Sequence, residues 1–307
     1  MAELAKSYYM DEMSQSEIAE RYKISRPTVA SILKKCREKG IVEIRINDKS
    51  LFYSEAGQSL VENFGLKTVC VVPHETDYPL TLYKTCYELA GFLSSLFTNR
   101  MKIGISWGTS LYHTIRQLPT LYLEDCEVVQ LMGGLGAAAL YYDGAELTRI
   151  LADKINAKFF PVLSPVLVQT QELRSALLKE PRIRETLDKT ESLDIALVGL
   201  SSDSPEDSAL VKAGFLSSQD ARQVYSEGSC GHLCGYHYDE SGNFMDSPIN
   251  NRVVGISPES FLKIKQRIGV ACGKQKARAI HAALKGGLIT DLFTDELTAL
   301  KIISFMR

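Results

Sequence analysis

The stretch "SQSEIAERY" near the start of the chain has the periodicity of an amphipathic helix. Its apolar side chains fall on one helical face, at Ile18, Ala19 and Tyr22. Ser14 is followed three residues later by Glu17, which is the spacing of a capping box, where the two side chains bind backbone N–H groups at a helix start. We therefore predict that a helix begins at Gln15.

A second amphipathic stretch follows a break at "KIS". Ser25 can cap the next helix, and Pro27 stands in its first turn, where the missing N–H is tolerated. Apolar side chains then recur at the spacing i, i+3, i+4 and i+7, at Val29, Ile32, Leu33 and Cys36. Gly40 is expected to end this helix. The following "IVEIRIN" alternates with period two, which predicts a short strand that exposes Glu43 and Arg45.

Two short helices joined by a tight turn and followed by a strand are typical of a winged helix-turn-helix, with residues 2–11 as a supporting helix. Charge favours a polyanion as the partner of this segment. From Arg21 to Arg45 eight basic residues stand against two acidic ones, although the whole chain of 307 residues has a net charge of −2. The local excess favours DNA binding. A protein-interaction module with a basic helical face is the alternative interpretation.

The predicted DNA contacts lie at the helix starts and along the outer face of the second helix. Arg26 can meet phosphates, while Thr28 and Ser31 point towards base edges. The full predicted set is Gln15, Arg26, Pro27, Thr28, Ser31, Lys34 and Lys35. Because one such unit makes few base contacts, we expect at least a dimer.

From Thr68 onward short apolar runs alternate with amphipathic stretches. The runs include "TVCVV", "KIGIS", "EVVQLM", "DIALVGL" and "RIGVAC". Such runs between amphipathic helices predict a mostly parallel sheet with helices on both faces, which is an α/β fold. The pattern changes near residues 48–51, so we expect one domain over 1–50 and a second over 51–307, with a connecting helix at 52–64.

Several of the predicted strands end in polar loops that contain glycine. The loops are Trp107-Gly108-Thr109-Ser110, Gly133-Gly134-Leu135-Gly136, Ser201-Ser202-Asp203 and Gly273-Lys274-Gln275-Lys276. The carboxyl ends of the strands form the ligand crevice of an open α/β sheet. Glycine N–H groups, hydroxyls and helix N-termini there favour an anion. We therefore predict that Thr109, Ser110 and Lys276 hold a phosphorylated or otherwise polar small molecule.

Neither a cofactor nor a metal is expected. "GVACGKQ" has three residues between its glycines where a P-loop has four, and Gln275 stands in place of the Mg²⁺-binding hydroxyl. No dinucleotide-binding glycine pattern follows a strand. "CGHLCGYH" contains Cys230, His232, Cys234 and His237, but its spacing is not that of a zinc finger. Alternation along a strand would also put His232 and His237 on opposite faces.

Catalytic residues are not indicated either. His113, His232, Asp143 and Lys276 are candidates, but no spacing joins them in a triad or dyad. Trp107 at a strand end has two interpretations, stacking on a sugar or packing in the core, and packing is favoured.

Composition places the chain in a broad class. No apolar run is long enough to span a bilayer, and the N-terminus lacks the pattern of a signal peptide. The seven cysteines are scattered, which indicates free thiols in a reducing compartment rather than a disulfide framework. We expect a cytoplasmic protein.

The chain resembles the SorC family of bacterial transcription regulators over essentially its whole length. The resemblance rests on the order and spacing of the N-terminal segment and of "GISWGTSL", "VVQLMGGLG", "ALVGLSS", "GYHYDESGNF" and "GVACGKQKARAIHAAL". It implies a Rossmann-like effector-binding and oligomerisation domain related to sugar-phosphate isomerases and deaminases, without their catalysis. It also implies phosphosugar effectors and tetramers built as dimers of dimers.

The resemblance extends to individual residues of the effector site. It assigns Gly108, Thr109 and Ser110 to a phosphate-contacting loop and Lys276 to a basic position at the start of a late helix. The whole set that it implies is Gly108, Thr109, Ser110, Gly133, Gly134, Asp143, Lys212, His232 and Lys276. Two positions depart from the family pattern. Met132 stands where some relatives have Arg or Lys, and His232 stands where an acidic residue usually accepts from sugar hydroxyls. A monophosphorylated or less anionic sugar or polyol is therefore expected.

The function predicted from these features is a DNA-binding repressor of a carbohydrate-catabolism operon. Its partners would be double-stranded operator DNA, the effector and further copies of the chain, without a membrane. The alternative is a sugar-phosphate isomerase- or deaminase-like enzyme fused to a DNA-binding head.

Overall fold

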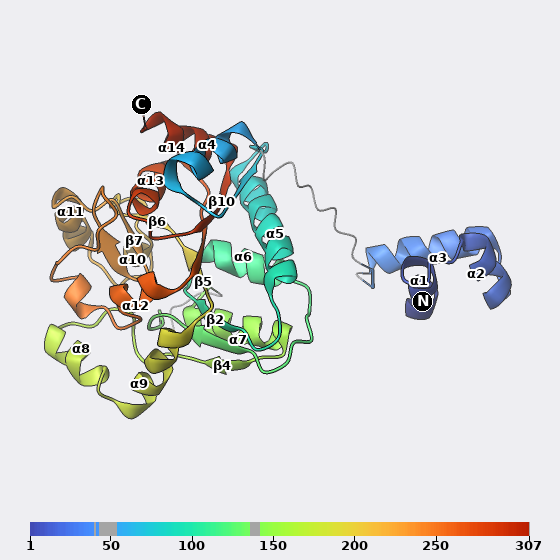
Figure 1. Ribbon diagram of the computed structural model, residues 1–307, viewed down its shortest axis with the longest axis horizontal. Coiled ribbons are helices and arrows are strands. Elements are labelled where there is room, and N and C mark those ends of the chain that lie inside the picture. Colours follow the sequence, from blue (N-terminus) through green and yellow to red (C-terminus); the bar gives the residue numbers. More distant parts are fainter. Residues whose placement is uncertain (40, 43–53, 136–141, 307) are drawn as a thin grey trace. The chain divides into compact units, whose positions relative to one another are not determined.

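The computed structural model describes residues 1–39, 41–42, 54–135 and 142–306. The chain divides into two compact units, Met1–Asn47 and Asp48–Arg307 (Figure 1). Each unit has its own hydrophobic core.

The described part of the smaller unit contains three helices, α1 (Ala2–Tyr9), α2 (Gln15–Tyr22) and α3 (Arg26–Glu38). The predicted capping box is present at α2, where Ser14 accepts from the backbone of Glu17 and Glu17 accepts from the backbone of Ser14. Ser25 caps α3 through the N–H of Thr28. The apolar faces of the three helices meet in one core of Leu4, Ala5, Ile18, Val29, Leu33 and Cys36.

The turn between α2 and α3 is tight because α2 ends at Lys23 in the left-handed conformation, with φ 52°. Ile41 and Val42 follow α3, and Val42 packs against the core of this unit. The predicted end of α3 at Gly40 and most of the predicted strand at 41–47 lie outside the described residues.

The larger unit contains a seven-stranded sheet in which every pair of neighbouring strands is parallel. In spatial order its strands are β1 (Thr68–Val72), β10 (Asp291–Asp295), β9 (Gln266–Val270), β5 (Ile195–Gly199), β2 (Lys102–Ile105), β3 (Glu127–Gln130) and β4 (Lys158–Phe160). The predicted mostly parallel α/β fold is therefore confirmed.

Helices cover both faces of the sheet because side chains alternate along each buried strand. In β1, Cys70 and Val72 belong to one core with α5 (Tyr78–Leu96), α6 (Thr109–Gln117) and α7 (Gly144–Ile155). Val69 and Val71 face the other core, which α4 (Glu55–Phe64), α13 (Ala277–Lys285) and α14 (Glu296–Ser304) cover. Figure 1 shows the two layers on either side of the strands.

The other helices and the 3₁₀ turns lie between these elements along the chain. They are α8 (Gln171–Leu177), α9 (Pro181–Asp188), α10 (Ala209–Lys212), α11 (Ser218–Ser226), α12 (Pro258–Lys263) and the 3₁₀ turns η2 (Lys189–Ser192), η3 (Asn250–Arg252) and η4 (Lys274–Lys276). A small antiparallel sheet of β6 (Ser201–Ser202), β7 (Gly231–Leu233) and β8 (Tyr236–Tyr238) was not predicted.

The hairpin of this small sheet corrects one expectation. Alternation along one strand predicted His232 and His237 on opposite faces. Instead Cys234 and Gly235, with φ 51° and 83°, form a two-residue turn between β7 and β8. His232 and His237 are therefore direct cross-strand partners, and directly opposite residues share a face.

Two general features of the structure agree with what the sequence led us to expect. All seven cysteines are buried, and none of them forms a disulfide. None of the helices in the described ranges is long and apolar enough to cross a membrane.

Candidate functional site

A cavity of about 260 Å³ opens at the carboxyl ends of the strands in the larger unit. It is lined by residues of the loops after β2 and β5, which are neighbours at the centre of the sheet. From β2 the strand order runs outward through β3 and β4, and from β5 it runs the other way through β9 and β10. The cavity thus lies at the switch point of the topology, where open α/β sheets bind ligands.

The start of α6 forms one wall of the cavity, with Gly108, Thr109 and Ser110 all in its lining. Gly108 is the N-cap, has φ 136° and ψ 158°, and offers no side chain to cap the helix. This backbone region is essentially restricted to glycine. The first N–H groups of a helix have no partner within the helix, so those of α6 are available to a ligand. Together with the helix dipole they favour an anion.

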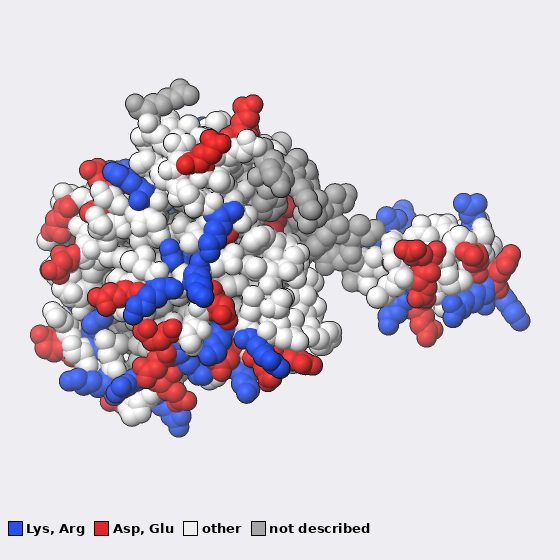
Figure 2. All heavy atoms as spheres, in the orientation of Figure 1, with Lys and Arg blue, Asp and Glu red and all other residues white. Residues whose placement is uncertain are grey.

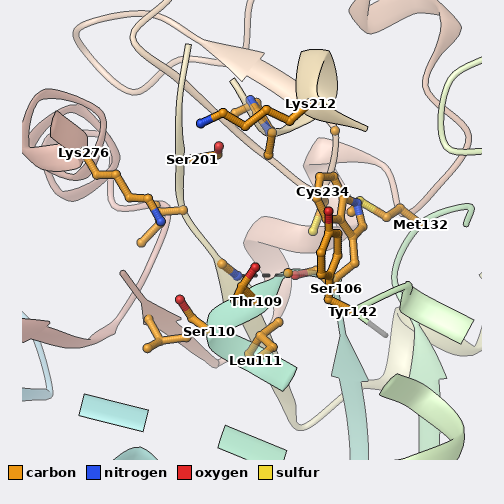
Figure 3. A pocket seen from close by; sticks show the side chains of 18 of the residues that line it. Ser106, Thr109, Ser110, Leu111, Met132, Tyr142, Ser201, Lys212, Cys234 and Lys276 are labelled. Atoms are coloured by element: carbon orange, nitrogen blue, oxygen red, sulfur yellow. Dashed lines mark hydrogen bonds between the residues drawn. The ribbon is translucent and has the colours of Figure 1, made fainter. Parts of the chain in front are cut away.

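Two lysines reach the same cavity from different parts of the chain. Lys276 follows β9 in η4, and Lys212 ends α10. Figure 3 shows both side chains extending into the pocket in which Thr109 and Ser110 also lie. Lys212 forms a long ion pair of 3.7 Å with Asp207. No carboxylate of the described residues forms an ion pair with Lys276. Burial lowers the pKa of Lys276, and the nearby Lys212 ammonium lowers it further.

Hydrogen bonds hold the loops of the cavity in place. The hydroxyl of Ser106 after β2 accepts from the N–H of Gly199 at the end of β5, at 3.3 Å. The N–H of Gly273 before η4 donates to Asp295 Oδ2 and Thr298 Oγ1, each at 2.9 Å. These bonds hold Gly273 at the start of the loop from which the side chain of Lys276 extends into the cavity.

One wall of the cavity is apolar and aromatic. Trp107 and Tyr142 lie with ring centroids 6.5 Å apart at an interplanar angle of 24°, and both line the cavity. Met132 and Leu82 lie in the same lining. The Nε1 of Trp107 is buried and has no hydrogen-bond partner among the described residues. Trp107 is thus largely buried, as the packing interpretation requires, but it also faces the cavity.

His232 lines the cavity from β7 and is tied to a buried carboxylate. Its Nδ1 lies 2.6 Å from Asp203 Oδ1, and the Nδ1 of His237 lies 2.6 Å from Asp203 Oδ2. Ser229 Oγ donates to Asp203 Oδ2 as well. Burial raises the pKa of Asp203, but its two histidine partners lower it by more, and the net shift is downward. Asp203 is therefore an anion at neutral pH.

Three of the predicted effector residues do not lie on the described lining of the cavity. The N–H groups of Gly133 and Gly134 donate to the carbonyls of Val254 and Ser164, at 2.9 and 2.8 Å. Asp143 caps α7 through the N–H of Ala145 and also accepts from the N–H of Leu135. The structure thus gives these groups hydrogen bonds that shape the loop after β3.

In the smaller unit the predicted DNA contacts lie together on the exposed side of α3. Arg26, Pro27, Thr28, Ser31, Lys34 and Lys35 are all exposed, and Gln15 at the start of α2 is half-buried. Lys34 forms a long surface ion pair of 3.9 Å with Glu38. Figure 2 shows basic and acidic side chains mixed on both units in the drawn view. The helix α3 itself carries Arg26, Lys34, Lys35 and Arg37 against Glu38.

Comparison with known proteins identifies the family. The family model of a sugar-binding domain, Sugar-bind, matches residues 49–304, and the model of a winged helix-turn-helix DNA-binding domain matches residues 11–43. The chain is a member of the SorC family of sugar-responsive transcriptional regulators. The predicted family is therefore confirmed.

Individual relatives cover nearly the whole chain. The deoxyribonucleoside regulator of Bacillus subtilis is 29% identical over 306 residues, which cover 98% of this chain and 96% of that protein. The transcriptional regulator LsrR of Enterobacter is 27% identical over 307 residues, with 99% and 92% covered. The crystal structure of the full-length sorbitol operon regulator SorC from Klebsiella pneumoniae matches with a TM-score of 0.82 and 26% identity, over 97% of this chain and 96% of that one.

These relatives decide between the two predicted functions. All three are named as regulators, and the models of a DNA-binding and a sugar-binding domain both match this chain. The chain is thus a transcriptional regulator of this kind, and the alternative of an enzyme is not favoured.

Sequence reasoning missed some lining residues because only the fold brings them to the cavity. Tyr78 and Leu82 come from α5, and Tyr142 precedes α7. Asp203 was read only as the end of a polar loop. Asp203 directly follows the short stretch "LSS", and nothing there indicated a histidine partner, since His232 lies 29 residues further on.

Proposed function

We propose that this regulator controls a carbohydrate-utilisation operon and that its effector is a phosphorylated sugar or polyol bound in the cavity at the carboxyl ends of β2 and β5. The proposal rests on one observation. A helix N-terminus without a capping side chain and two lysines meet at one cavity, which also has an aromatic wall. Two ammonium groups in one cavity repel each other, and an anion between them removes that repulsion.

In the proposed complex the phosphate lies at the start of α6. The N–H groups of Thr109 and Ser110, with their hydroxyls, would donate to phosphate oxygens, and Lys276 would supply charge. Lys212 would contact the phosphate or a neighbouring hydroxyl. The carbon skeleton would lie against the ring of Trp107, and His232 lines the same cavity. Gly133, Gly134 and Asp143 would act indirectly, by holding the loop after β3.

Two further observations support a singly phosphorylated sugar or polyol. Met132 lines the cavity, so the position before the Gly-Gly pair contributes no cation for a second phosphate. The names of two relatives, a deoxyribonucleoside regulator and a sorbitol operon regulator, both refer to compounds with a sugar or polyol part.

The DNA side of the proposal rests on α3. Arg26 and Lys35 would contact phosphates, while Thr28, Ser31 and Lys34 would lie against base edges in the major groove. Gln15 and Pro27 would lie at the two helix starts that approach the backbone. We further propose a cytoplasmic homo-oligomer, a dimer of dimers, that acts as a repressor. An effector with different affinity for two quaternary arrangements would then change the affinity for DNA.

The experiment uses full-length protein and the DNA upstream of its own gene. Fluorescence anisotropy would measure binding of that fragment in the presence and absence of a panel of phosphosugars, with the matching unphosphorylated sugars as controls. The proposal expects tight binding of the fragment and a shift in affinity with at least one phosphosugar. Binding of DNA that no phosphosugar or sugar alters would contradict it.

A further inference from the structure

The cavity of the larger unit has two sides of different chemical character. Figure 3 shows Lys276 and Ser110 on one side of it and sulfur-containing and aromatic side chains on the opposite side. The ring of Trp107 belongs to the second side, because its centroid lies 6.5 Å from that of Tyr142 at an interplanar angle of 24°. We call the second side the apolar wall, and it consists of Trp107, Met132, Tyr142 and Cys234.

The lining of the cavity lacks the side chains that can hold two neighbouring hydroxyl groups at once. Among the described residues it contains no aspartate, glutamate, asparagine, glutamine or arginine. Residues 136–141, which lie outside the described part of the chain and precede Tyr142, have the sequence GAAALY and contain none of these types either. Carboxylate, amide and guanidinium groups each offer two or more hydrogen-bonding atoms. A skeleton with a hydroxyl on every carbon therefore finds few partners here.

Several polar atoms of the lining are already engaged or covered. The hydroxyl of Ser106 accepts from the N–H of Gly199, at 3.3 Å. Nδ1 of His232 lies 2.6 Å from a carboxylate oxygen of Asp203. Nε2 of His232 and Nε1 of Trp107 are both buried, so neither atom meets a ligand while these side chains lie as they do. The donors at the start of α6 and the two lysines are in turn taken by the phosphate of the proposed complex.

The energetic consequence is a preference for C–H over O–H groups at the apolar wall. A hydroxyl group that leaves water without gaining a hydrogen bond raises the free energy of the complex. A CH₂ or CH₃ group in the same place lowers it, because apolar surface of the ligand and of the protein is removed from water. The aromatic rings and the thioether of Met132 are suited to such contacts. An apolar pocket rejects an added hydroxyl by up to about 100-fold.

We infer that the effector is the phosphate ester of a deoxysugar, held with the carbon that lacks a hydroxyl against the apolar wall. The inference rests on the proposed function, because the phosphate at the start of α6 determines which end of the molecule faces the wall. The carbon without a hydroxyl is therefore one that lies far from the phosphate. Fully hydroxylated sugar phosphates of the same size bind more weakly.

Binding of matched pairs to the full-length protein tests this selection. The two compounds of each pair differ in one hydroxyl remote from the phosphate. One pair is 2-deoxyglucose 6-phosphate with glucose 6-phosphate, and the other is L-fucose 1-phosphate with L-galactose 1-phosphate. Isothermal titration calorimetry should show that the deoxy compound binds more tightly by about tenfold or more in at least one pair. If the hydroxylated compound binds as tightly or more tightly in both pairs, the inference is wrong.

A simpler pair decides the case in which none of these four sugar phosphates binds. The compounds n-propyl phosphate and glycerol 3-phosphate share a chain of three carbons and differ in two hydroxyls, so they report on the lining without the shape of a sugar. The inference expects n-propyl phosphate to bind more tightly, by about tenfold or more. Equal or tighter binding of glycerol 3-phosphate would overturn it.

Two conservative variants locate the selection at the apolar wall. Cys234→Ser and Met132→Gln each place a hydrogen-bonding group among these side chains, and at least one of them should reduce the preference for the compound with fewer hydroxyls by about threefold or more. Cys126→Ser is the control, because Cys126 is also buried, donates to the carbonyl of Thr98 and does not line the cavity. A preference that neither Cys234→Ser nor Met132→Gln reduces would contradict the assignment to this wall.

The outcomes separate this inference from the proposed function. If the phosphate esters bind no more tightly than free 2-deoxyglucose and glucose, the proposed effector class fails, and the preference between these two free sugars alone decides the character of the wall. If phosphate esters bind, Lys276→Met abolishes their binding and the hydroxylated compounds are preferred, the proposed function stands and this inference fails.

Discussion

Lys212 and Lys276 bring two ammonium groups to one cavity from α10 and from the turn after β9. The charge of Lys212 contributes to the lowered pKa of Lys276, after the larger effect of burial. In the absence of an anion, repulsion between these two ammonium groups destabilises the folded state. The same pair becomes a source of affinity when a phosphate binds, because the repulsion is then replaced by attraction to both cations.

The first prediction concerns Lys276→Met, which keeps an unbranched side chain but removes the charge. Binding of a phosphosugar should weaken by about 10- to 100-fold, since a hydrogen bond to a charged group is lost. Isothermal titration calorimetry measures the change. Lys179→Met is the control because Lys179 is exposed on the surface after α8 and does not line the cavity. Unchanged affinity in Lys276→Met would exclude this lysine from the site.

The lowered pKa of Lys276 also predicts a pH dependence of stability. Between the lowered pKa in the folded state and the ordinary value of 10.5, the unfolded chain binds more protons than the folded one. Stability contributed by this group therefore rises with pH in that interval. Without effector, the Tm of wild type relative to Lys276→Met should increase as the pH is raised from neutral towards 10.5. A difference that stays constant or falls would contradict the shift.

Gly108→Ala tests the backbone at the start of α6. An added Cβ meets no atom within 4 Å, yet φ 136° is unfavourable for any residue with a side chain. The cost is about 1–3 kcal/mol of stability, and relaxation of the turn should also weaken phosphosugar binding. Gly65→Ala is matched, because Gly65 has φ 65° and equally open space but lies away from the cavity. It should lower Tm without changing affinity, as differential scanning fluorimetry and calorimetry can show.

Trp107→Phe separates the ring of Trp107 from its N–H group. The indole Nε1 is buried in the wall of the cavity without a partner among the described residues. If the ring turns on binding so that Nε1 donates to a hydroxyl of the effector, the substitution should reduce affinity by about 3- to 10-fold and leave binding of inorganic phosphate unchanged. Equal losses for phosphosugar and phosphate would point to a packing defect.

A further prediction addresses DNA binding by α3. Arg26→Ala should weaken binding to a duplex of arbitrary sequence and reduce the slope of log affinity against log salt by about 1, since one phosphate contact is lost. Fluorescence anisotropy across a salt series measures the slope, and calorimetry should show unchanged phosphosugar binding. Lys179→Ala, an exposed basic position in the larger unit, should leave the slope as in wild type.

Much of the fold was predictable because its signals are local. The Ser14–Glu17 capping box, the spacing of Val29, Leu33 and Cys36, and the alternation of Val69 to Val72 each depend on neighbouring residues. The loops after β2 and β9 were identified from glycine, hydroxyl and lysine positions, and the fold does bring them to one cavity.

The remainder depends on non-local geometry. The face of His237 was predicted wrongly, because the two-residue turn at Cys234 and Gly235 reverses the chain within the stretch that was read as one strand. The hydrogen bonds of Asp143 depend on Leu135 lying close to the start of α7. The pairing of Asp203 with His232 depends on β6 and β7 forming one sheet. None of these contacts has a signature in residue spacing.

The most direct test of the central claim is a thermal-shift comparison of wild type and Lys276→Met against phosphorylated sugars and polyols and their unphosphorylated counterparts. A ligand that binds only the folded state raises Tm by mass action. The account predicts that at least one phosphosugar stabilises wild type, that its unphosphorylated counterpart has little effect, and that Lys276→Met loses the shift. Stabilisation by unphosphorylated sugars alone, or a shift that Lys276→Met retains in full, would contradict it.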